Sequence, residues 1–306
     1  MPKRRTLLIA VACVVVVAAI ALFPRTSEPA YNGLPLSTWV AAFTEVGPGE
    51  KTFQKAMEAV DHIGTNATPF LLAWIQFEPP PGPFTSKFVN PYNWDGRPLS
   101  FRDRLLYDFR GKRERLAEGA ETAFQVLGAR ATPAIPELTR LMNARTGPLM
   151  ALRAALALAR LGTNGLPPLL AAIDDPQHQN RFDALKALDM LPDPLKLPAE
   201  RVVPHLIQCV SDQNDKRVAP TAVYALRKFG SEPRLVIPVL TNCLNSTDHR
   251  IRWWSATALG DIGRPAAAAL PALTNALSDP DPSVRQQAGY AIEKIGPTPR
   301  SNAPAH

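Results

Sequence analysis

The sequence predicts an all-α protein: an α-solenoid of about seven helical hairpins, preceded by one transmembrane helix. A repeated alanine pattern and a proline that returns once per repeat predict the solenoid, and an uncharged apolar run near the N-terminus predicts the membrane helix. Apolar residues make up 46% and charged residues 20% of the 306 residues, which is typical of globular proteins.

The N-terminal segment has the order of charge and apolarity that a membrane anchor needs. Residues 1–5 hold three basic side chains, and residues 6–23 follow without a charge. A helix of these 18 residues is about 27 Å long, enough to cross the core of a bilayer. A cleaved signal peptide is the alternative, because Ala19-Ile20-Ala21 resembles a cleavage site, although the apolar run is longer than usual.

The basic flank also predicts the orientation of the chain. Lys3, Arg4 and Arg5 supply three of the net +7 charges, and basic flanks stay on the cytoplasmic side. We therefore expect residues 24–30 to be a linker and the bulk of the chain to lie outside the cytoplasm, on the periplasmic side, held by a single N-terminal helix.

One register of small residues recurs along the rest of the chain. Six glycines and one proline mark the ends of seven helical segments, and the last two steps between these anchors are both 33 residues. Alanine occupies 13 of the 14 positions that lie eight and five residues before the anchors. Small side chains let neighbouring helices approach closely, so these alanines predict the seams of a stack. The anchors are Gly64, Gly128, Gly162, Pro192, Gly230, Gly263 and Gly296.

A second pattern, Pro-x-Leu-x-x-x-aliphatic, follows each anchor except the last. Proline fits the first turn of a helix, where its missing N–H has no partner, so each proline predicts the start of a second helix. A single hairpin cannot bury its apolar stripe alone, and the hairpins are therefore expected to stack. The prolines are Pro69, Pro136, Pro167, Pro204, Pro238 and Pro271.

The first-helix segments resemble a known repeat family. DHRIRWWSATALGDIG (248–263) and DPSVRQQAGYAIEKIG (281–296) are similar to HEAT repeats of the bilin-lyase-like type. The resemblance implies a HEAT-repeat solenoid over residues 31–297, followed by a flexible tail at 298–306. YNGLPLSTWVAAF, which begins at residue 31, resembles the opening segment of membrane-anchored bacterial HEAT-repeat proteins. Residues 31–46 are therefore expected to cap the stack, with Ser37 as a helix N-cap.

No motif in the sequence predicts catalysis, and the HEAT fold implies no particular activity because it serves adaptors and enzymes alike. The five histidines lack the adjacent glutamate of a HEAT-type metal hydroxylase, and the pair Glu58 and His62 is incomplete as a metal site. GPGEKT at 47–52 departs from a phosphate-binding loop, because Glu50 precedes Lys51 and no strand comes before it. We expect no cofactor, no metal and no enzymatic activity.

Nucleic-acid binding would need a row of aligned basic side chains. The resemblance implies that the second helices line the concave face, where the residues four and seven after each proline share one side. Of these 12 positions only Arg140 and Asp174 are charged. The densest basic stretch, residues 102–115, is diluted by acidic residues and is expected to be a solvated helix face. We therefore expect no nucleic-acid partner.

Two further features are expected to be structural. Cys209 and Cys243 occupy one column of the second helices, so stacking holds them about 8–10 Å apart, too far for a disulfide. Arg181, Arg252 and Arg285 lie eleven residues before their anchors, where each is expected to pair with an aspartate of a neighbouring turn rather than with a ligand. The candidate aspartates near helix starts are Asp175, Asp212, Asp248 and Asp281.

Two aromatic features are the candidate partner-binding sites. The step between the first two anchors is 64 residues, and residues 77–101 within it carry six prolines and six aromatic side chains. We expect this aromatic insert to be ordered, either as a contact surface or as a lid over the first repeat. The second feature is an aromatic pair just before Gly263 that either contacts a partner or fills a groove between repeats. The candidate residues are Phe88, Tyr92, Trp94, Trp253 and Trp254.

These observations predict a non-enzymatic, membrane-anchored scaffold or adaptor that binds a protein partner through the surface of its solenoid. The family resemblance leaves open an accessory or lyase-like subunit that acts on a bound substrate, and nucleic-acid binding is a third alternative.

Overall fold

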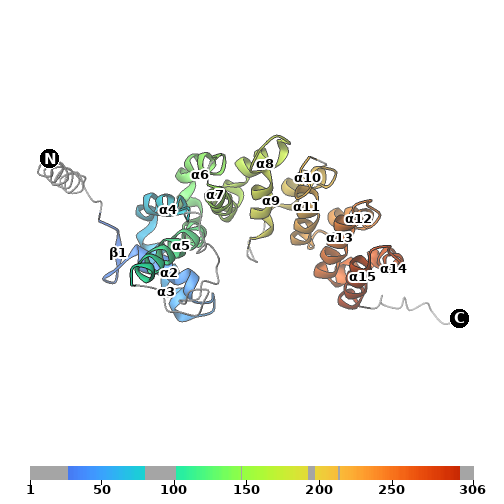
Figure 1. Ribbon diagram of the computed structural model, residues 1–306, viewed down its shortest axis with the longest axis horizontal. Coiled ribbons are helices and arrows are strands. Elements are labelled where there is room, and N and C mark those ends of the chain that lie inside the picture. Colours follow the sequence, from blue (N-terminus) through green and yellow to red (C-terminus); the bar gives the residue numbers. More distant parts are fainter. Residues whose placement is uncertain (1–26, 80–100, 146, 192–196, 213, 297–306) are drawn as a thin grey trace, which may run out of the picture.

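The computed structural model describes residues 27–79, 101–145, 147–191, 197–212 and 214–296, with the backbone alone for 101–110. Over these ranges the chain forms an arch of paired helices (Figure 1). None of the helices in them is long and apolar enough to cross a bilayer. The expected membrane helix at 6–23 and the expected tail at 298–306 lie outside the described residues.

The predicted solenoid of helical hairpins is confirmed for the described residues. Six hairpins follow one another, and a last first helix, α15, ends the stack. The first helices are α3 (Lys51–Ile63), α5 (Phe101–Leu127), α7 (Pro148–Arg160), α9 (Arg181–Asp189), α11 (Val218–Ala225), α13 (His249–Ile262) and α15 (Pro282–Ile295). The second helices are α4 (Thr68–Ile75), α6 (Ile135–Met142), α8 (Leu166–Asp174), α10 (Ala199–Val210), α12 (Pro233–Cys243) and α14 (Leu270–Ala276).

Short 3-10 helices join the two helices of most hairpins. They are η1 (Gly64–Ala67), η2 (Gly128–Ala134), η3 (Gly162–Asn164), η4 (Leu226–Phe229) and η5 (Arg264–Ala269). Five of the anchor glycines have a positive φ, a conformation that glycine adopts without steric cost. Gly230 is different, with a φ of −63°. A methyl group there would lie 2.9 Å from the Ile262 side chain, so Gly230 is needed for close approach.

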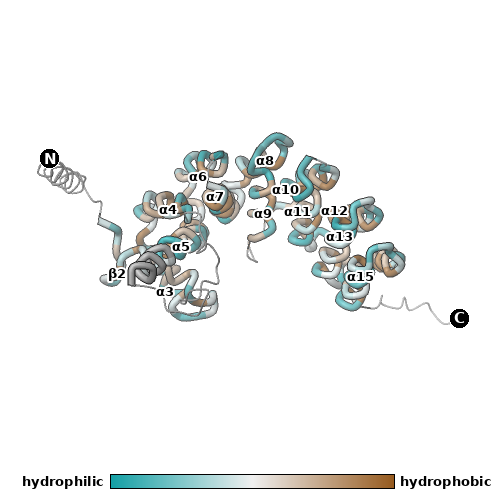
Figure 2. The backbone as a smooth tube through the Cα atoms, in the orientation of Figure 1, coloured by the Kyte–Doolittle hydropathy of each residue, from teal (hydrophilic) through white to brown (hydrophobic). Residues whose placement is uncertain are grey.

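The alanine register forms the seams between first helices, as predicted. The 13 alanines are at most 1% exposed, and Ser255, the exception in the pattern, is fully buried. The Ser255 hydroxyl donates to the carbonyl oxygen of Ile251 at 2.7 Å, which satisfies it inside its own helix. At Gly260 a Cβ would lie 3.0 Å from the Cα of Ala291, so α13 and α15 nearly touch backbone to backbone. Figure 2 shows the alternation of apolar and polar residues around the stacked helices.

The predicted role of the prolines is right for four second helices and wrong for two. Pro69, Pro136, Pro167 and Pro271 lie in the first turn of their helices. Pro204 and Pro238 instead lie inside α10 and α12, which begin five residues earlier. In α12 another proline, Pro233, already occupies the first helical position, and Pro198 is the N-cap of α10.

The first helices line the concave side of the arch, which corrects the expectation that the second helices do so. In Figure 1 the helices α9, α11, α13 and α15 lie along the inner edge, with α8, α10, α12 and α14 outside them. Consecutive first helices pack closely along their lengths, whereas α10 and α12 meet at only a few residues. The alanine seams explain this curvature, because they shorten the distance between consecutive first helices and leave the distance between consecutive second helices larger.

A small hairpin and one helix cap the N-terminal end. Strands β1 (Ala30–Tyr31) and β2 (Leu34–Pro35) pair antiparallel and lead into α2 (Leu36–Glu45), which packs on α3 and α5. The sequence predicts Ser37 as the N-cap of α2. This prediction is wrong, because the helix begins one residue before it. The carboxylate of Glu28 takes that role and accepts from both the backbone N–H and the hydroxyl of Ser37.

The region of the aromatic insert is only partly described. Part of the surplus length is helical, because α5 has 27 residues and begins at Phe101. At the other end, Phe77 lies two residues after the end of α4 and accepts a hydrogen bond from Arg153 through its carbonyl oxygen, at 2.5 Å. The guanidinium carbon of Arg113 lies 5.0 Å from the Phe77 ring centroid. The expected site residues Phe88, Tyr92 and Trp94 lie outside the described residues.

The predicted arginine–aspartate ladder is confirmed for one pair and corrected for another. Arg181, which is 7% exposed, pairs with Asp212 of the next repeat and donates to the carbonyl oxygen of Ile173 at 2.6 Å. Arg252 makes two hydrogen bonds to Asp279, at 2.7 and 2.8 Å, rather than to one of the expected aspartates.

The expected aspartates at the last two first helices act as caps instead. Asp248 and Asp281 accept hydrogen bonds from the backbone N–H groups of Arg250 and Ser283. Arg285 donates to two backbone carbonyl groups, those of residues 279 and 280.

Candidate functional site

The inner face of the arch carries the residues that lie three, six and ten positions before the anchors. Helical periodicity places these positions opposite the buried alanines at eight and five, so their side chains point away from the second helices. Figure 1 places the first helices on the concave side, so this face lines the hollow of the arch. We call it the inner face.

An aromatic cluster lies on the inner face at α11 and α13. The ring centroids of Trp253 and Trp254 are 4.6 Å apart, edge to face at 86°. Trp254 in turn packs against Tyr224 of the preceding repeat at 4.5 Å and against the buried core. Trp254 therefore fills a groove between repeats, which is one of the two expected roles, and it supports Trp253 on the inner face. The expected contact with a partner stays a prediction.

A charged network fixes this aromatic cluster from the other side. The guanidinium carbon of Arg227 lies 4.0 Å from the Tyr224 ring centroid, and Arg227 donates to Asp189 of the preceding repeat at 2.8 Å. Asp261 of the next repeat accepts from the Tyr224 hydroxyl at 3.3 Å and from Lys294 at 2.8 Å. Side chains from four successive first helices or their turns are thus joined along the inner face.

The network also holds a carboxylate away from water. Burial raises the pKa of Asp189, and Arg227 and Lys228 oppose that rise. Arg227 and Asp189 are each 19% exposed, so their pairing is screened less than that of a surface ion pair. The cluster of Trp253, Trp254, Tyr224 and Arg227 is therefore held by contacts within the chain itself. Such preorganisation lowers the entropy cost of binding.

Sequence reasoning missed Tyr224 and Arg227, although the register contained a signal. Tyr224 and Tyr290 both lie six positions before their anchors, in a column that the inner face exposes. Tyr290 is 49% exposed and continues the aromatic side chains toward the C-terminal end of the stack. The sequence analysis expected the second helices to line the concave face, whereas the first helices, which carry Tyr224 and Tyr290, form it.

The charges of the inner face and its edge are nearly balanced. At the positions three, six and ten before the seven anchors and at the adjoining position two, six side chains are acidic and five are basic. A phosphate backbone needs an excess of aligned basic groups, so the described part of this face is a poor match for nucleic acid. The acidic residues are Glu58, Asp61, Glu118, Asp189, Asp261 and Glu293, and the basic residues are Arg160, Lys186, Arg227, Lys228 and Lys294.

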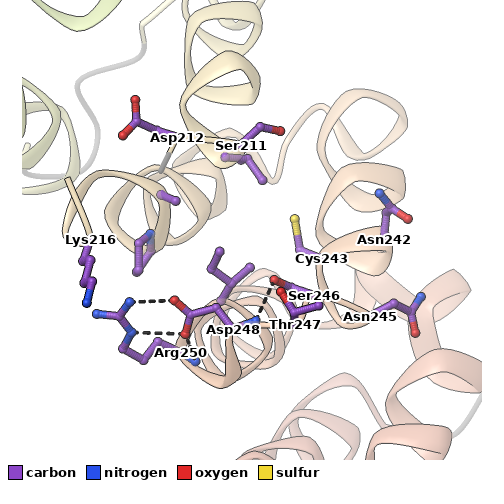
Figure 3. A pocket seen from close by; sticks show the side chains of 14 residues that line it. Ser211, Asp212, Lys216, Asn242, Cys243, Asn245, Ser246, Thr247, Asp248 and Arg250 are labelled. Carbon is purple, nitrogen blue, oxygen red and sulfur yellow. Dashed lines mark hydrogen bonds and ion pairs between the residues drawn. The ribbon is translucent and has the colours of Figure 1, made fainter. Parts of the chain in front are cut away.

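A polar hollow of about 640 Å³ lies at the edge of the stack, between the loop after α10 and the loop after α12 (Figure 3). The thiol of Cys243 points into it, and Asp248 and Arg250 pair along another wall at 2.6 Å. Because these two charges satisfy each other, the hollow offers little net charge to a bound group. Asp248 is also the N-cap of α13, so this hollow follows from how the repeats are joined.

The cysteines and histidines of the described ranges form no metal site. Cys209 and Cys243 are both buried and unpaired, as the column argument predicts. Burial raises the pKa of each thiol. His62 packs on the Tyr31 ring at 4.7 Å. The described residues contain no cluster of three or more His, Cys, Asp or Glu side chains that could hold a metal ion.

The comparison with protein families identifies the repeats. A family model described as HEAT repeats matches residues 166–259 and 237–304. Residues 166–304 therefore belong to the HEAT-repeat family. The matched HEAT repeats include α8 to α15 and therefore the aromatic cluster, and no curated protein matches the chain. The resemblance to the bilin-lyase-like type and to membrane-anchored bacterial proteins stays a prediction.

Solved structures resemble the HEAT-repeat chain only distantly. A designed armadillo repeat protein in complex with the peptide (KR)4 is 17% identical, covers 64% of this chain and all of its own, and has a TM-score of 0.42. A computationally designed armadillo repeat protein for modular peptide recognition is 15% identical, covers 85% of this chain and all of its own, and has a TM-score of 0.43. An engineered protein is 16% identical over 85% of this chain and 68% of its own, with a TM-score of 0.41.

Proposed function

We propose that this HEAT-repeat protein is a non-enzymatic scaffold that binds a segment of a protein partner along its inner face. Residues 6–23 hold the scaffold in a membrane, with the solenoid on the periplasmic side. The alternative of a lyase-like subunit has no assigned residue in the described ranges, and the nearly balanced charge of the inner face disfavours nucleic acid.

The aromatic cluster is the single observation that carries the proposal. Tryptophan, tyrosine and arginine are the residues most often found at the energetic centres of protein interfaces. Here they meet on a concave face, and Arg227 and Asp261 hold them in place through four repeats. A partner that covers Trp253 gains apolar contact area without having to order the side chains beneath it.

The membrane part of the proposal rests on the basic flank and the uncharged run that follows it. An apolar segment of 18 residues spans a bilayer core, and the positive-inside rule directs the C-terminal side outward. A scaffold tethered in this way would meet partners that are themselves exported or embedded in the same membrane.

Partner capture from solubilised membranes tests the scaffold function. We expect Trp253→Ala to weaken capture by at least about fivefold, which corresponds to roughly 1 kcal/mol, while helical content is retained. Leu235→Ala on the outer helix α12 is the control, because it removes a side chain that is 44% exposed on the other side of the stack. Unchanged capture by a folded Trp253→Ala variant would remove the aromatic cluster from the site.

The aromatic insert is tested separately by the double change Tyr92→Ala and Trp94→Ala. Reduced capture with an unchanged circular dichroism spectrum supports a contact surface. Loss of folding supports a lid over the first repeat instead.

A further inference from the structure

A second hollow of about 750 Å³ lies on the inner face, some repeats away from the aromatic cluster. It forms between α2, α3, α5 and the end of α7, and its size is within the range of ligand pockets. The apolar part of its lining comes from five side chains: Phe43, Pro48, Phe53, Met57 and Val126. Phe43 and Phe53 meet edge to face at 5.1 Å, and Met57 is 36% exposed. Apolar groups therefore remain uncovered here on the concave side.

One polar group in this hollow is incompletely paired. Arg160 is the last residue of α7, and its side chain is only 17% exposed. One terminal nitrogen donates to Thr122 at 3.3 Å and to Gln125 at 3.0 Å. The other lies 3.9 Å from Glu121, and Nε is buried without a hydrogen-bond partner.

An arginine has five N–H donors, and those left without an acceptor inside a protein are costly. Burial lowers the pKa of Arg160, and the charge of Glu121 offsets this only in part. A carboxylate is the acceptor that suits a guanidinium best, because two parallel hydrogen bonds can form.

We propose that this hollow binds a partner segment in which an apolar side chain is followed by an acidic one. The apolar side chain occupies the space over Phe53, Met57 and Val126, and the carboxylate accepts hydrogen bonds from Arg160. The proposal rests on the scaffold function and deepens it by naming the chemistry of the bound segment.

Two features favour a polypeptide over a small carboxylic acid as the source. The hollow opens on the same face as the aromatic cluster, so one extended segment can follow the inner face through both. Glu58 and Asp61 form a further part of its lining and disfavour a second negative charge there. The ligand is therefore an apolar group with one carboxylate placed toward α7, continued by an uncharged chain.

A matched pair of labelled peptides tests the proposal on the full-length chain in lipid nanodiscs. The peptides are Ser-Gly-Phe-Glu-Gly-Ser and its Gln counterpart, each with blocked ends, and binding is followed by fluorescence anisotropy. We expect the Glu peptide to bind about tenfold more tightly, because a hydrogen bond to a charged partner is worth at least that factor. Arg160→Met should abolish this difference, and Arg140→Met, an exposed arginine on α6, should preserve it.

A second variant keeps the test decisive if Arg160→Met fails to fold. Met57→Glu changes a partly exposed residue at the mouth of the hollow and should weaken both peptides. Equal binding of the two peptides to the wild-type chain overturns the proposal, as does binding of hexanoate without binding of either peptide. Partner capture that depends on Trp253 but not on Arg160 overturns this inference and leaves the scaffold function standing.

Discussion

Gly119 lies where the cap helix α2 crosses α5, and replacing it with alanine tests whether close approach holds the cap. A methyl group there would overlap the carbonyl oxygen of Val40 and lie 2.9 Å from its Cγ1. The oxygen is part of the backbone, so α2 as a whole must move by about 1 Å to restore normal contact.

The cost follows from what α2 buries. Leu36, Trp39, Val40 and Phe43 are at most 9% exposed, and at roughly 2 kcal/mol each they contribute about 8 kcal/mol. A gap approaching 1 Å forfeits a quarter to a half of such contacts, which is about 2–4 kcal/mol. Alanine returns about 1 kcal/mol through its better helix propensity. We therefore expect Gly119→Ala to lower the free energy of unfolding by about 1–3 kcal/mol.

Gly111→Ala in the same helix is the matched control. Among the residues whose side chains the structure describes, its Cβ would meet only the end of the long Arg115 side chain, at 3.4 Å, so the propensity gain should remain. Urea unfolding followed by circular dichroism should show Gly119→Ala less stable than wild type and Gly111→Ala equal or more stable. Equal midpoints for the two variants would refute the packing argument.

Three further predictions concern charge, thiols and topology. The hydrogen bonds from Arg252 lower the pKa of Asp279, so this pair stabilises the fold above the ordinary aspartate pKa of about 4 and the contribution is lost as pH falls through the lowered value. Asp279→Asn should therefore narrow the difference between the urea midpoints of unfolding at pH 7 and pH 3. An unchanged difference would speak against a stabilising role of the Arg252–Asp279 pair. Because burial raises their thiol pKa values, Cys209 and Cys243 should react with iodoacetamide much more slowly in the folded chain than after unfolding, and a bridge between them in non-reduced digests would contradict the repeat register. A reporter fused after His306 should be active only in an exported compartment and stay with membranes after an alkaline wash, and recovery of a soluble cytoplasmic chain would disprove the anchor.

The sequence was sufficient for the repeat register because its determinants are local. Alanine at fixed distances before a turn glycine encodes both the helix face and its end, and five anchor glycines do end their helices, with a positive φ. The prediction that Cys209 and Cys243 form no disulfide was likewise correct, and both are buried because of their shared position in the second helix.

Features that depend on competition between neighbours were not predictable in this way. Asp279 and Asp281 lie two residues apart, and the pattern does not decide which one caps α15 and which one binds Arg252. Ser37 lost the capping role to Glu28, which is nine residues away and belongs to the segment before the cap. The alanine seams predict that the first helices pack closely. The direction of the curvature follows only when the weaker packing between second helices such as α10 and α12 is also known.

The candidate site shows the same division. Trp253 and Trp254 stood out because they depart from polar columns, so one sequence was enough to select them. Tyr224, Arg227 and Asp189 come from other repeats, and their convergence depends on the rotation between successive hairpins, which the register does not encode.

The unequal spacing of the two helical rows has a mechanical consequence. In a bent beam, the line along which material neither stretches nor shortens lies close to its stiffest layer. Here that layer is the row of first helices, where the backbones at Gly260 and Ala291 leave no room for an added Cβ without a close contact. Opening or closing of the arch therefore changes the gaps between outer helices such as α10 and α12, while the distances along the inner face stay nearly constant. The arch can therefore bend and still present Arg160 and Trp253 at a nearly fixed separation.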